Sequence, residues 1–190
     1  MEVRSLFIGR FQPFHIGHLA DIKSIITKGE YCIITIAAAN KVGTWRNPLT
    51  GDEREMILRE TLAEEEKLNP GSVPPDRYEI HQLADIDDDA RWAQYVVDSL
   101  PKFNKIYSGS AFVRSFFEKN PQFETLPITF VLDNEGERLC ATTIRKKVLK
   151  WEDYGDYIRP KTGEILDKLA FRERLVRVTP KPVDVTHITT

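Results

Sequence analysis

The sequence is poor in cysteine, with 2 among its 190 residues, and it has no long apolar run. Cys32 lies inside an apolar segment and Cys140 far along the chain, so their spacing predicts neither a disulfide framework nor a metal site. No run approaches the roughly 20 apolar residues that span a membrane, and Met1 to Arg4 lack the features of a signal peptide. We therefore expect a cytoplasmic protein with no membrane partner and no metal held by its own side chains.

A large excess of one charge is also absent. The formal net charge is −2 at pH 7, so no broad basic field indicates a nucleic-acid partner. The hydrophobic share of 41% is ordinary for a globular protein, and 190 residues suffice for one sizeable core. We expect a single domain over residues 1–190, with residues 152–190 as a C-terminal extension packed on it.

Apolar, β-branched runs alternate with helical patterns along the chain. Strands are predicted at residues 3–8, 31–37, 78–83, 105–108 and 127–132. Helices are predicted from Leu19, after Thr50, around Trp92, at Phe112, from Thr142, and from Ile165 to Phe171. Thr50 and Glu53 form a capping box at the start of the second helix. In the helix from Thr142, Trp151 is expected to face inward. This alternation predicts an α/β fold with a doubly wound parallel five-stranded sheet. In such a sheet the ligand lies beyond the carboxyl ends of the strands, where the strand order reverses.

The turn after the first predicted strand concentrates groups that suit phosphate. His15 and His18 lie three residues apart at the expected helix start, so they share one face, and Gly17 leaves space for a close ligand. The free N–H groups of a helix start and the nearby Arg10 add positive charge. The alternative is a surface helix with two solvated histidines, which the flanking Arg10, Gln12 and Gly17 make less attractive.

A second candidate phosphate site is the predicted helix at residues 142–151. We expect Thr142 at its N-cap and Arg145 three residues later on the same face, where it could bind phosphate bidentately. The alternative is an ordinary capped helix with a basic surface.

Residues 9–18, Gly-Arg-Phe-Gln-Pro-Phe-His-Ile-Gly-His, resemble the signature of nucleotidyltransferases with a His-x-Gly-His motif. In this ten-residue form they resemble the archaeal-type nicotinamide-nucleotide adenylyltransferases. Thr142, Ile144 and Arg145 match the second signature of that superfamily. In this chain, Cys140 and Ala141 stand where the archaeal-type group usually has Ser-Gly. The resemblance implies a Rossmann-like nucleotidyltransferase fold.

Three further stretches carry the same resemblance. Residues 46–54 are similar to the family block that supplies a phosphate-binding arginine, here Arg46, and we expect Arg54 to be a structural ion-pair residue. Tyr107-Ser108-Gly109 matches the family segment at the adenylate moiety. Asp85-Ile86 with Trp92 resembles the stretch that binds the nicotinamide ring, and Asp89 stands where the family has Asn. Phe116 and Phe117 are expected in the core.

The resemblance implies adenylyl transfer from ATP to nicotinamide mononucleotide, giving NAD and pyrophosphate, with Mg²⁺ bound to ATP and a homo-oligomeric assembly. The implied site residues are His15, His18 and Arg145 as catalytic groups; Gly9, Arg10, Phe11, Gln12, Gly17, Arg46, Ser108, Gly109 and Thr142 around ATP and its phosphates; and Asp85, Ile86 and Trp92 around the nicotinamide nucleotide. Alternatives are another acceptor, such as phosphopantetheine, FMN or a sugar phosphate, with ATP or CTP, or a non-catalytic nucleotide sensor.

Overall fold

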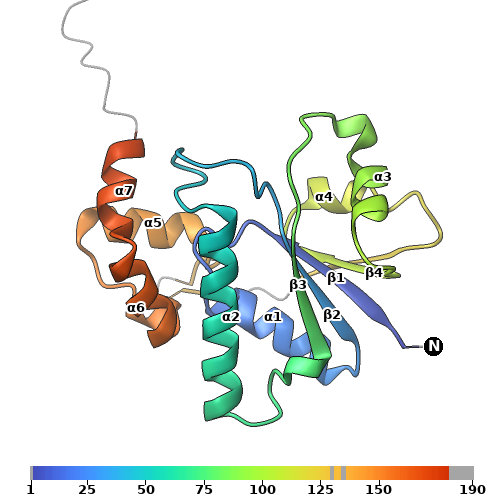
Figure 1. The fold of residues 1–190 in the computed structure, drawn as a ribbon, viewed down its shortest axis with the longest axis horizontal. Coiled ribbons are helices and arrows are strands. Elements are labelled where there is room, and N and C mark those ends of the chain that lie inside the picture. The colour runs from blue at the N-terminus through green and yellow to red at the C-terminus, as the bar shows by residue number, and fades with distance from the viewer. Residues whose placement is uncertain (1, 129–130, 134–135, 180–190) are drawn as a thin grey trace, which may run out of the picture.

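The computed structural model describes residues 2–128, 131–133 and 136–179. Its centre is a five-stranded parallel sheet in the order β3-β2-β1-β4-β5 (Figure 1). The strands are β1 (Arg4–Gly9), β2 (Tyr31–Ile36), β3 (Tyr78–Gln82), β4 (Lys105–Ser108) and β5 (Glu124–Pro127). All four pairings are parallel. The predicted doubly wound α/β architecture is therefore confirmed.

Helices cover both faces of the sheet. They are α1 (Ile16–Thr27), α2 (Gly51–Leu68), α3 (Asp89–Ser99), α4 (Ala111–Ser115), α5 (Ala141–Lys150), α6 (Pro160–Lys168) and α7 (Phe171–Val178), with 3-10 turns at Pro75–Arg77 and Gly155–Tyr157. Figure 1 shows α3 and α4 together at one side of the sheet and α1, α2 and the C-terminal helices at the other.

Side-chain alternation along β1 explains the two layers. Leu6 and Ile8 point into a core shared with α3 and Phe117, whereas Phe7 points into the larger core shared with α1, α2 and the C-terminal helices. All three side chains are buried, as expected for a central strand that helices cover on both faces. Because β1 pairs with β2 on one side and β4 on the other, the strand order reverses between β1 and β4. A ligand crevice is expected at that point.

Two predictions for the second half of the chain are wrong. The fifth strand is Glu124–Pro127, so it ends where the predicted segment 127–132 begins; residues 129 and 130 of that segment lie outside the described residues. Trp151 does not face inward: it is 81% exposed and has a left-handed backbone (φ 60°) that ends α5. Its ring instead stacks against the Arg172 guanidinium.

The C-terminal segment contains two helices rather than the predicted single helix from Ile165 to Phe171. α6 and α7 are separated at Leu169 and Ala170, where Ala170 takes a left-handed conformation (φ 49°). Leu166 and Leu175 are fully buried in the larger core. Residues 180–190, predicted as part of the extension, lie outside the described residues.

Polar contacts join this segment to α2. The Thr61 and Thr162 hydroxyls are 2.9 Å apart, and Arg174 Nη1 lies 2.6 Å from Glu53 Oε1. The buried Glu65 carboxylate pairs with Lys23 of α1 and, at 2.9 Å, with Arg159. Residues 152–179 are therefore built into the rest of the fold. None of the helices described is both long and apolar enough to cross a membrane.

Candidate active site

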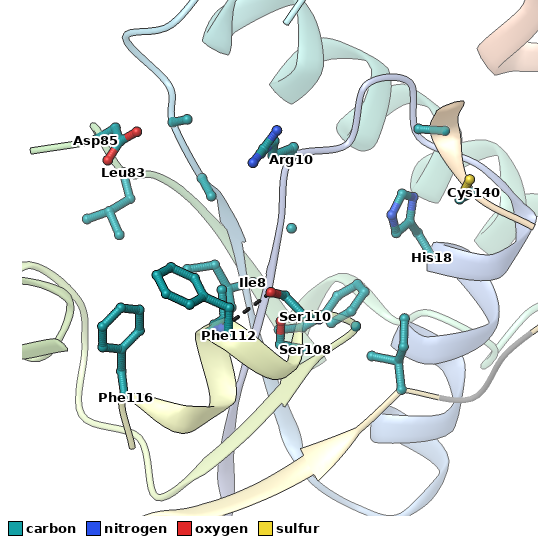
Figure 2. A pocket seen from close by; sticks show the side chains of 18 of the residues that line it. Ile8, Arg10, His18, Leu83, Asp85, Ser108, Ser110, Phe112, Phe116 and Cys140 are labelled. Carbon is teal, nitrogen blue, oxygen red and sulfur yellow. Dashed lines mark hydrogen bonds between the residues drawn. The ribbon is translucent and has the colours of Figure 1, made fainter. Parts of the chain in front are cut away.

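A cavity of about 380 Å³ opens at the carboxyl ends of β1 and β4, at the reversal of strand order. It is lined by Ile8 and Gly9 from β1, by Ser108 at the end of β4 and by Gly109 after it. One end holds His15 and His18, and the α5 N-terminus reaches it through Cys140 and Ala141, while Arg10 lies between this end and Asp85 (Figure 2). Figure 2 shows His18 and Cys140 on one side of the cavity, across from Asp85 and Phe116 on the other.

The two histidines cap the helix that carries them. His15 is the N-cap of α1, and its Nδ1 accepts a hydrogen bond from the His18 backbone N–H at 3.4 Å. His18 Nδ1 accepts in turn from the His15 backbone N–H at 3.3 Å. The pair is a capping box made of imidazoles, and the rings stack with centroids 3.6 Å apart.

This reciprocal cap fixes the protons on both rings. A ring nitrogen that accepts a hydrogen bond carries no proton, so in the neutral ring the proton lies on Nε2. Burial, and then the charge of Arg138, lower the pKa of His15 to about 3. Burial also holds the pKa of His18 well below its usual range, with further contributions from His15 and Arg138. Both rings are therefore neutral at pH 7 and each presents one Nε2–H donor at a pocket that both rings line.

Neutral, buried histidines make stability depend on pH. In the unfolded chain a histidine titrates near pH 6.5; because the folded pKa of His15 is about 3, its contribution is full above pH 6.5 and is lost as the pH falls toward 3. The expected slope is about 1.4 kcal/mol per pH unit. We expect urea unfolding to show a shallower pH dependence between pH 6.5 and 4 in His15→Asn, whose Oδ1 can still cap but does not titrate. The same pH dependence in both proteins would refute the buried neutral state of His15.

Three predicted phosphate-binding residues, in the turn after β1 and at the start of α1, are used for packing and contacts within the fold. Gly17 is absent from the cavity lining; a Cβ there would lie 3.0 Å from His15 Nδ1, so the glycine makes room for that ring. Phe11 and Gln12 are each 1% exposed. The Gln12 amide donates to the Leu49 carbonyl at 2.9 Å and accepts from the Leu49 N–H at 3.0 Å. Phosphate contacts by these three residues stay predictions.

Thr142 is not the N-cap of α5, as the sequence had predicted. Cys140 takes that place without a side-chain capping bond, because α5 begins one residue before Thr142. The Thr142 hydroxyl instead accepts from Arg145 Nη2 at 3.0 Å, which confirms that the two residues share a helix face.

Arg145 lies behind the cavity lining rather than in it. It is 5% exposed, its Nη1 donates to the Gln12 carbonyl at 2.6 Å, and its guanidinium lies 5.1 Å from the Trp45 ring centre. Burial lowers its pKa to about 10, so it remains charged at pH 7. Arg46 is exposed on the loop before α2 and is likewise outside the lining. Direct phosphate binding by either arginine stays a prediction.

Arg138 is a cationic residue of the cavity that the sequence reasoning missed. It lines the cavity, and its Nη2 donates to the Gly109 carbonyl at 3.5 Å. A Cβ at Gly109 would come within 2.5 Å of that nitrogen, so the glycine is needed for the approach. Its position depends on the chain after β5 turning back, which the antiparallel bridge between Leu132 and Arg138 records. The sequence favours a turn between Asp133 and Gly136, but it does not show that the chain after this turn reaches the cavity.

Arg54 is a buried positioning residue and not the predicted ion-pair partner. Its side chain is fully buried and donates to four backbone carbonyls, of Thr50 (3.0 Å), Arg10 (3.0 Å), Ala37 (2.8 Å) and Ala38 (3.0 Å). Burial lowers its pKa to about 10, with a smaller contribution from Arg10, so it stays charged at pH 7. Three of these carbonyls belong to residues that line the cavity, so Arg54 joins α2 to the cavity rim.

The other end of the cavity is aromatic. Trp92 lines it and packs against Phe116, with ring centres 5.3 Å apart. Phe116 packs, partly buried, against the smaller core and also lines the cavity, whereas Phe117 is buried as predicted. Asp85 lies at the same end, but its N–H and carbonyl are both bonded to the Asn40 side-chain amide, at 2.8 and 3.1 Å.

The cavity thus brings together most of the predicted groups, and leaves some outside. Of the predicted site residues, it is lined by Gly9, Arg10, His15, His18, Asp85, Trp92, Ser108 and Gly109. Those outside the lining are Phe11, Gln12, Gly17, Arg46, Ile86, Thr142 and Arg145.

Comparison with known proteins identifies a family. Residues 6–147 match the family model described as cytidylyltransferase-like. The chain is 31% identical over 185 residues to the nicotinamide-nucleotide adenylyltransferase of Thermoplasma volcanium, covering 97% of both chains. It is 33% identical to the protein of the same name from Methanococcus aeolicus, covering 96% of this chain and 99% of that one.

Solved structures share the fold. A bifunctional NMN adenylyltransferase/ADP ribose pyrophosphatase from Francisella tularensis, complexed with AMP and a manganese ion, superposes with a TM-score of 0.67 at 24% identity. The alignment covers 94% of this chain and 52% of that one, so this chain spans about half of the bifunctional protein. The nicotinic acid mononucleotide adenylyltransferase of Plasmodium falciparum, complexed with NaAD, gives 0.59 at 13% identity, covering 91% of this chain and 98% of that one.

Proposed function

Because this chain belongs to the cytidylyltransferase-like family, and within it to the nicotinamide-nucleotide adenylyltransferases, we propose that it transfers the adenylyl group of ATP to nicotinamide mononucleotide. The products are NAD and pyrophosphate. The observation that carries this proposal is one cavity with two unlike ends: the two imidazoles and Arg138 at one, and an aromatic wall at the other. Such a cavity suits polyphosphate joined to flat bases.

The reaction requires no covalent intermediate with the protein, because the acceptor phosphate is already an anion. One of its oxygens attacks the α-phosphorus of ATP, the new P–O bond forms, and the bond to the β-phosphate oxygen breaks. The electron pair of that bond leaves with pyrophosphate. The protein then contributes orientation and stabilisation of the charge that develops on the leaving group.

The roles of the side chains follow from the protons they carry. The Nε2–H groups of His15 and His18 donate to the triphosphate and to the departing pyrophosphate. Arg138 supplies positive charge beside the histidines and Arg10 supplies it between the two ends of the cavity, and their places in the lining support this role. Arg46, on an exposed loop, would close over the phosphates, and Arg145 would hold the loop at Gln12 in place.

Mg²⁺ enters as part of the ATP substrate in this proposal. Within the described ranges, no group of three or more His, Cys, Asp or Glu side chains is placed to hold a metal ion. This donor set fits a metal held mainly by phosphate oxygens, which is the usual mode for Mg²⁺ at nucleotide sites. When bound, the ion would neutralise triphosphate charge alongside the arginines. Homo-oligomeric assembly stays a prediction.

A panel of acceptors and nucleotides tests the proposal. Purified protein is offered nicotinamide mononucleotide, phosphopantetheine, FMN or a sugar phosphate, each with ATP or CTP, and pyrophosphate release is measured. We expect ATP with nicotinamide mononucleotide to give the highest kcat/KM. Preference for CTP or for another acceptor would overturn the substrate assignment, and nucleotide binding with no pyrophosphate release would indicate a sensor.

A further inference from the structure

The aromatic end of the cavity is a continuous wall built from two helical segments. Phe112 and Phe116 meet edge to face with ring centres 4.7 Å apart, and Phe116 continues to Trp92 of α3. Phe112 is 60% exposed although it lines the cavity, so part of its surface is available at the mouth. Figure 2 shows Phe112 and Phe116 on the same side of the cavity as Asp85. A flat, cationic ring gains from such aromatic faces.

Two carboxylates line this same end. Asp85 follows β3, and Asp89 is the first residue of α3. The nearby lysine, Lys41, is paired with Asp87 through a contact of 2.7 Å, and its charge also acts on Asp85, whereas Asp89 is not among the groups that raise the pKa of Lys41. Arg138 lies near the histidines, since its charge helps to lower the pKa of both, and Figure 2 shows Arg10 between His18 and Asp85. The phosphate end therefore holds the Arg138 guanidinium, and the ring end holds two carboxylates.

This polarity distinguishes two otherwise similar acceptors. The pyridine ring of a nicotinamide nucleotide is a cation with a neutral carboxamide, whereas a nicotinate nucleotide carries a carboxylate on that ring. Like charges brought close together repel, and opposite charges attract. A carboxylate on the ring would meet Asp85 and Asp89, whereas a carboxamide would not.

We propose that Asp89, together with Asp85, makes the ring end of the cavity select a cationic ring bearing a carboxamide over the same ring bearing a carboxylate. The inference rests on the proposed function and names the acceptor that the site prefers. Asp89 is the specificity-determining residue, because it is an exposed carboxylate that lines the cavity one helical turn before Trp92. The aromatic rings supply affinity for either acceptor, and the carboxylates supply the discrimination.

The test compares kcat/KM for nicotinamide and nicotinate mononucleotide in the wild type and in Asp89→Asn. We expect the wild type to prefer the nicotinamide nucleotide and the variant to reduce that preference about two- to fivefold, the size of effect that a partly exposed charge pair gives. Raising the salt concentration should weaken the wild-type preference in the same direction. An unchanged preference in the variant, or a wild-type preference for the nicotinate nucleotide, would overturn the inference.

Two matched variants separate charge from packing. Asp98→Asn removes the same charge from the exposed far end of α3 and should leave the preference as in the wild type. Phe112→Leu removes a ring face without changing charge, and we expect both acceptors to lose the same factor in kcat/KM. A change of preference in either variant would refute the assignment to Asp89.

Failure of the proposed function is a distinct outcome. If neither mononucleotide yields a dinucleotide with ATP, adenylyl transfer is wrong. Calorimetric titration with the same two mononucleotides then tests the selection directly: tighter binding of the nicotinamide nucleotide that Asp89→Asn weakens relative to the other supports it. Equal binding of the two by the wild type contradicts it.

Discussion

Replacing His18 by Asn is expected to lower kcat about a hundred- to a thousandfold, the loss typical of removing one preorganised donor to a developing anion. The Asn Oδ1 takes the position of the ring Nδ1, so it can accept from the His15 N–H and preserve the helix cap. The Nε2–H donor is lost. We expect the dissociation constant of nicotinamide mononucleotide to stay within about threefold of the wild type, because the lost bond acts on the triphosphate. Steady-state kinetics and calorimetry measure the two quantities.

His18→Gln is the matched counterpart, because its amide nitrogen reaches the position of Nε2 while nothing replaces Nδ1. It should retain more activity than His18→Asn and unfold more easily, by about 1 kcal/mol, the usual value of a lost N-cap. If His18→Asn weakened acceptor binding as much as it lowered kcat, His18 would not act on the triphosphate. If the two variants had the same activity and stability, the separate roles of the two ring nitrogens would be wrong.

Replacing Arg54 by Met is expected to destabilise the protein by about 3–5 kcal/mol. The Thr50 and Ala38 carbonyls keep the backbone N–H groups of Arg54 and Lys41, but the Arg10 and Ala37 carbonyls would lose their donor, and each unsatisfied buried group costs about 1–3 kcal/mol. Because the carbonyls of Arg10, Ala37 and Ala38 belong to residues at the cavity rim, KM for ATP should rise as well. Urea unfolding and steady-state kinetics provide the measurements.

Arg59→Met, on the same helix, is the control for Arg54. Arg59 is more than half exposed and pairs with Glu55 one turn away, so its removal should change stability by less than about 0.5 kcal/mol. Arg54→Lys should remain strongly destabilised, since one ammonium cannot reproduce the fork of a guanidinium. A loss of stability in Arg54→Met no larger than in Arg59→Met would show that the carbonyl contacts do not hold the rim.

The central strands could be predicted because a strand that is buried on both faces has a nearly continuous run of apolar residues. Residues 31–37 are almost continuously apolar, and β2 occupies Tyr31–Ile36. β5 has no such apolar run, because it is an edge strand that is held mainly by backbone pairing. Glu124–Pro127 is partly exposed and pairs with β4 alone. The apolar run after it misled the prediction because Ile128 and Val131 do pack on the core, outside any strand.

Helix ends were the weaker part of the prediction. Thr142 has the chemistry of an N-cap, but its hydroxyl accepts from Arg145, and Cys140 is the N-cap of a helix that begins at Ala141. Trp151 continues the apolar spacing of α5, yet the left-handed turn at that residue takes it out to solvent. The spacing of apolar residues predicts which side chains lie on the buried face of a helix, but it does not predict the residue at which the helix begins or ends.

Some residues of the candidate site could be predicted from the sequence, and others could not. His15 and His18 were identifiable because strand, turn and helix follow one another within a few residues. Arg138 was not, because a local turn pattern at residues 133–136 does not specify that the chain after it lies against the cavity. Arg54 looked like an ion-pair residue because a sequence shows a charge but not the four carbonyls converging on it.

The most direct test of adenylyl transfer follows phosphorus atoms from ATP labelled separately at the α and γ positions. With nicotinamide mononucleotide as acceptor, the α label is expected in NAD and the γ label in pyrophosphate, in equal amounts. Recovery of the γ label in the acceptor together with ADP would show phosphoryl transfer. Either that result, or both labels remaining in ATP, would contradict the function assigned to this site.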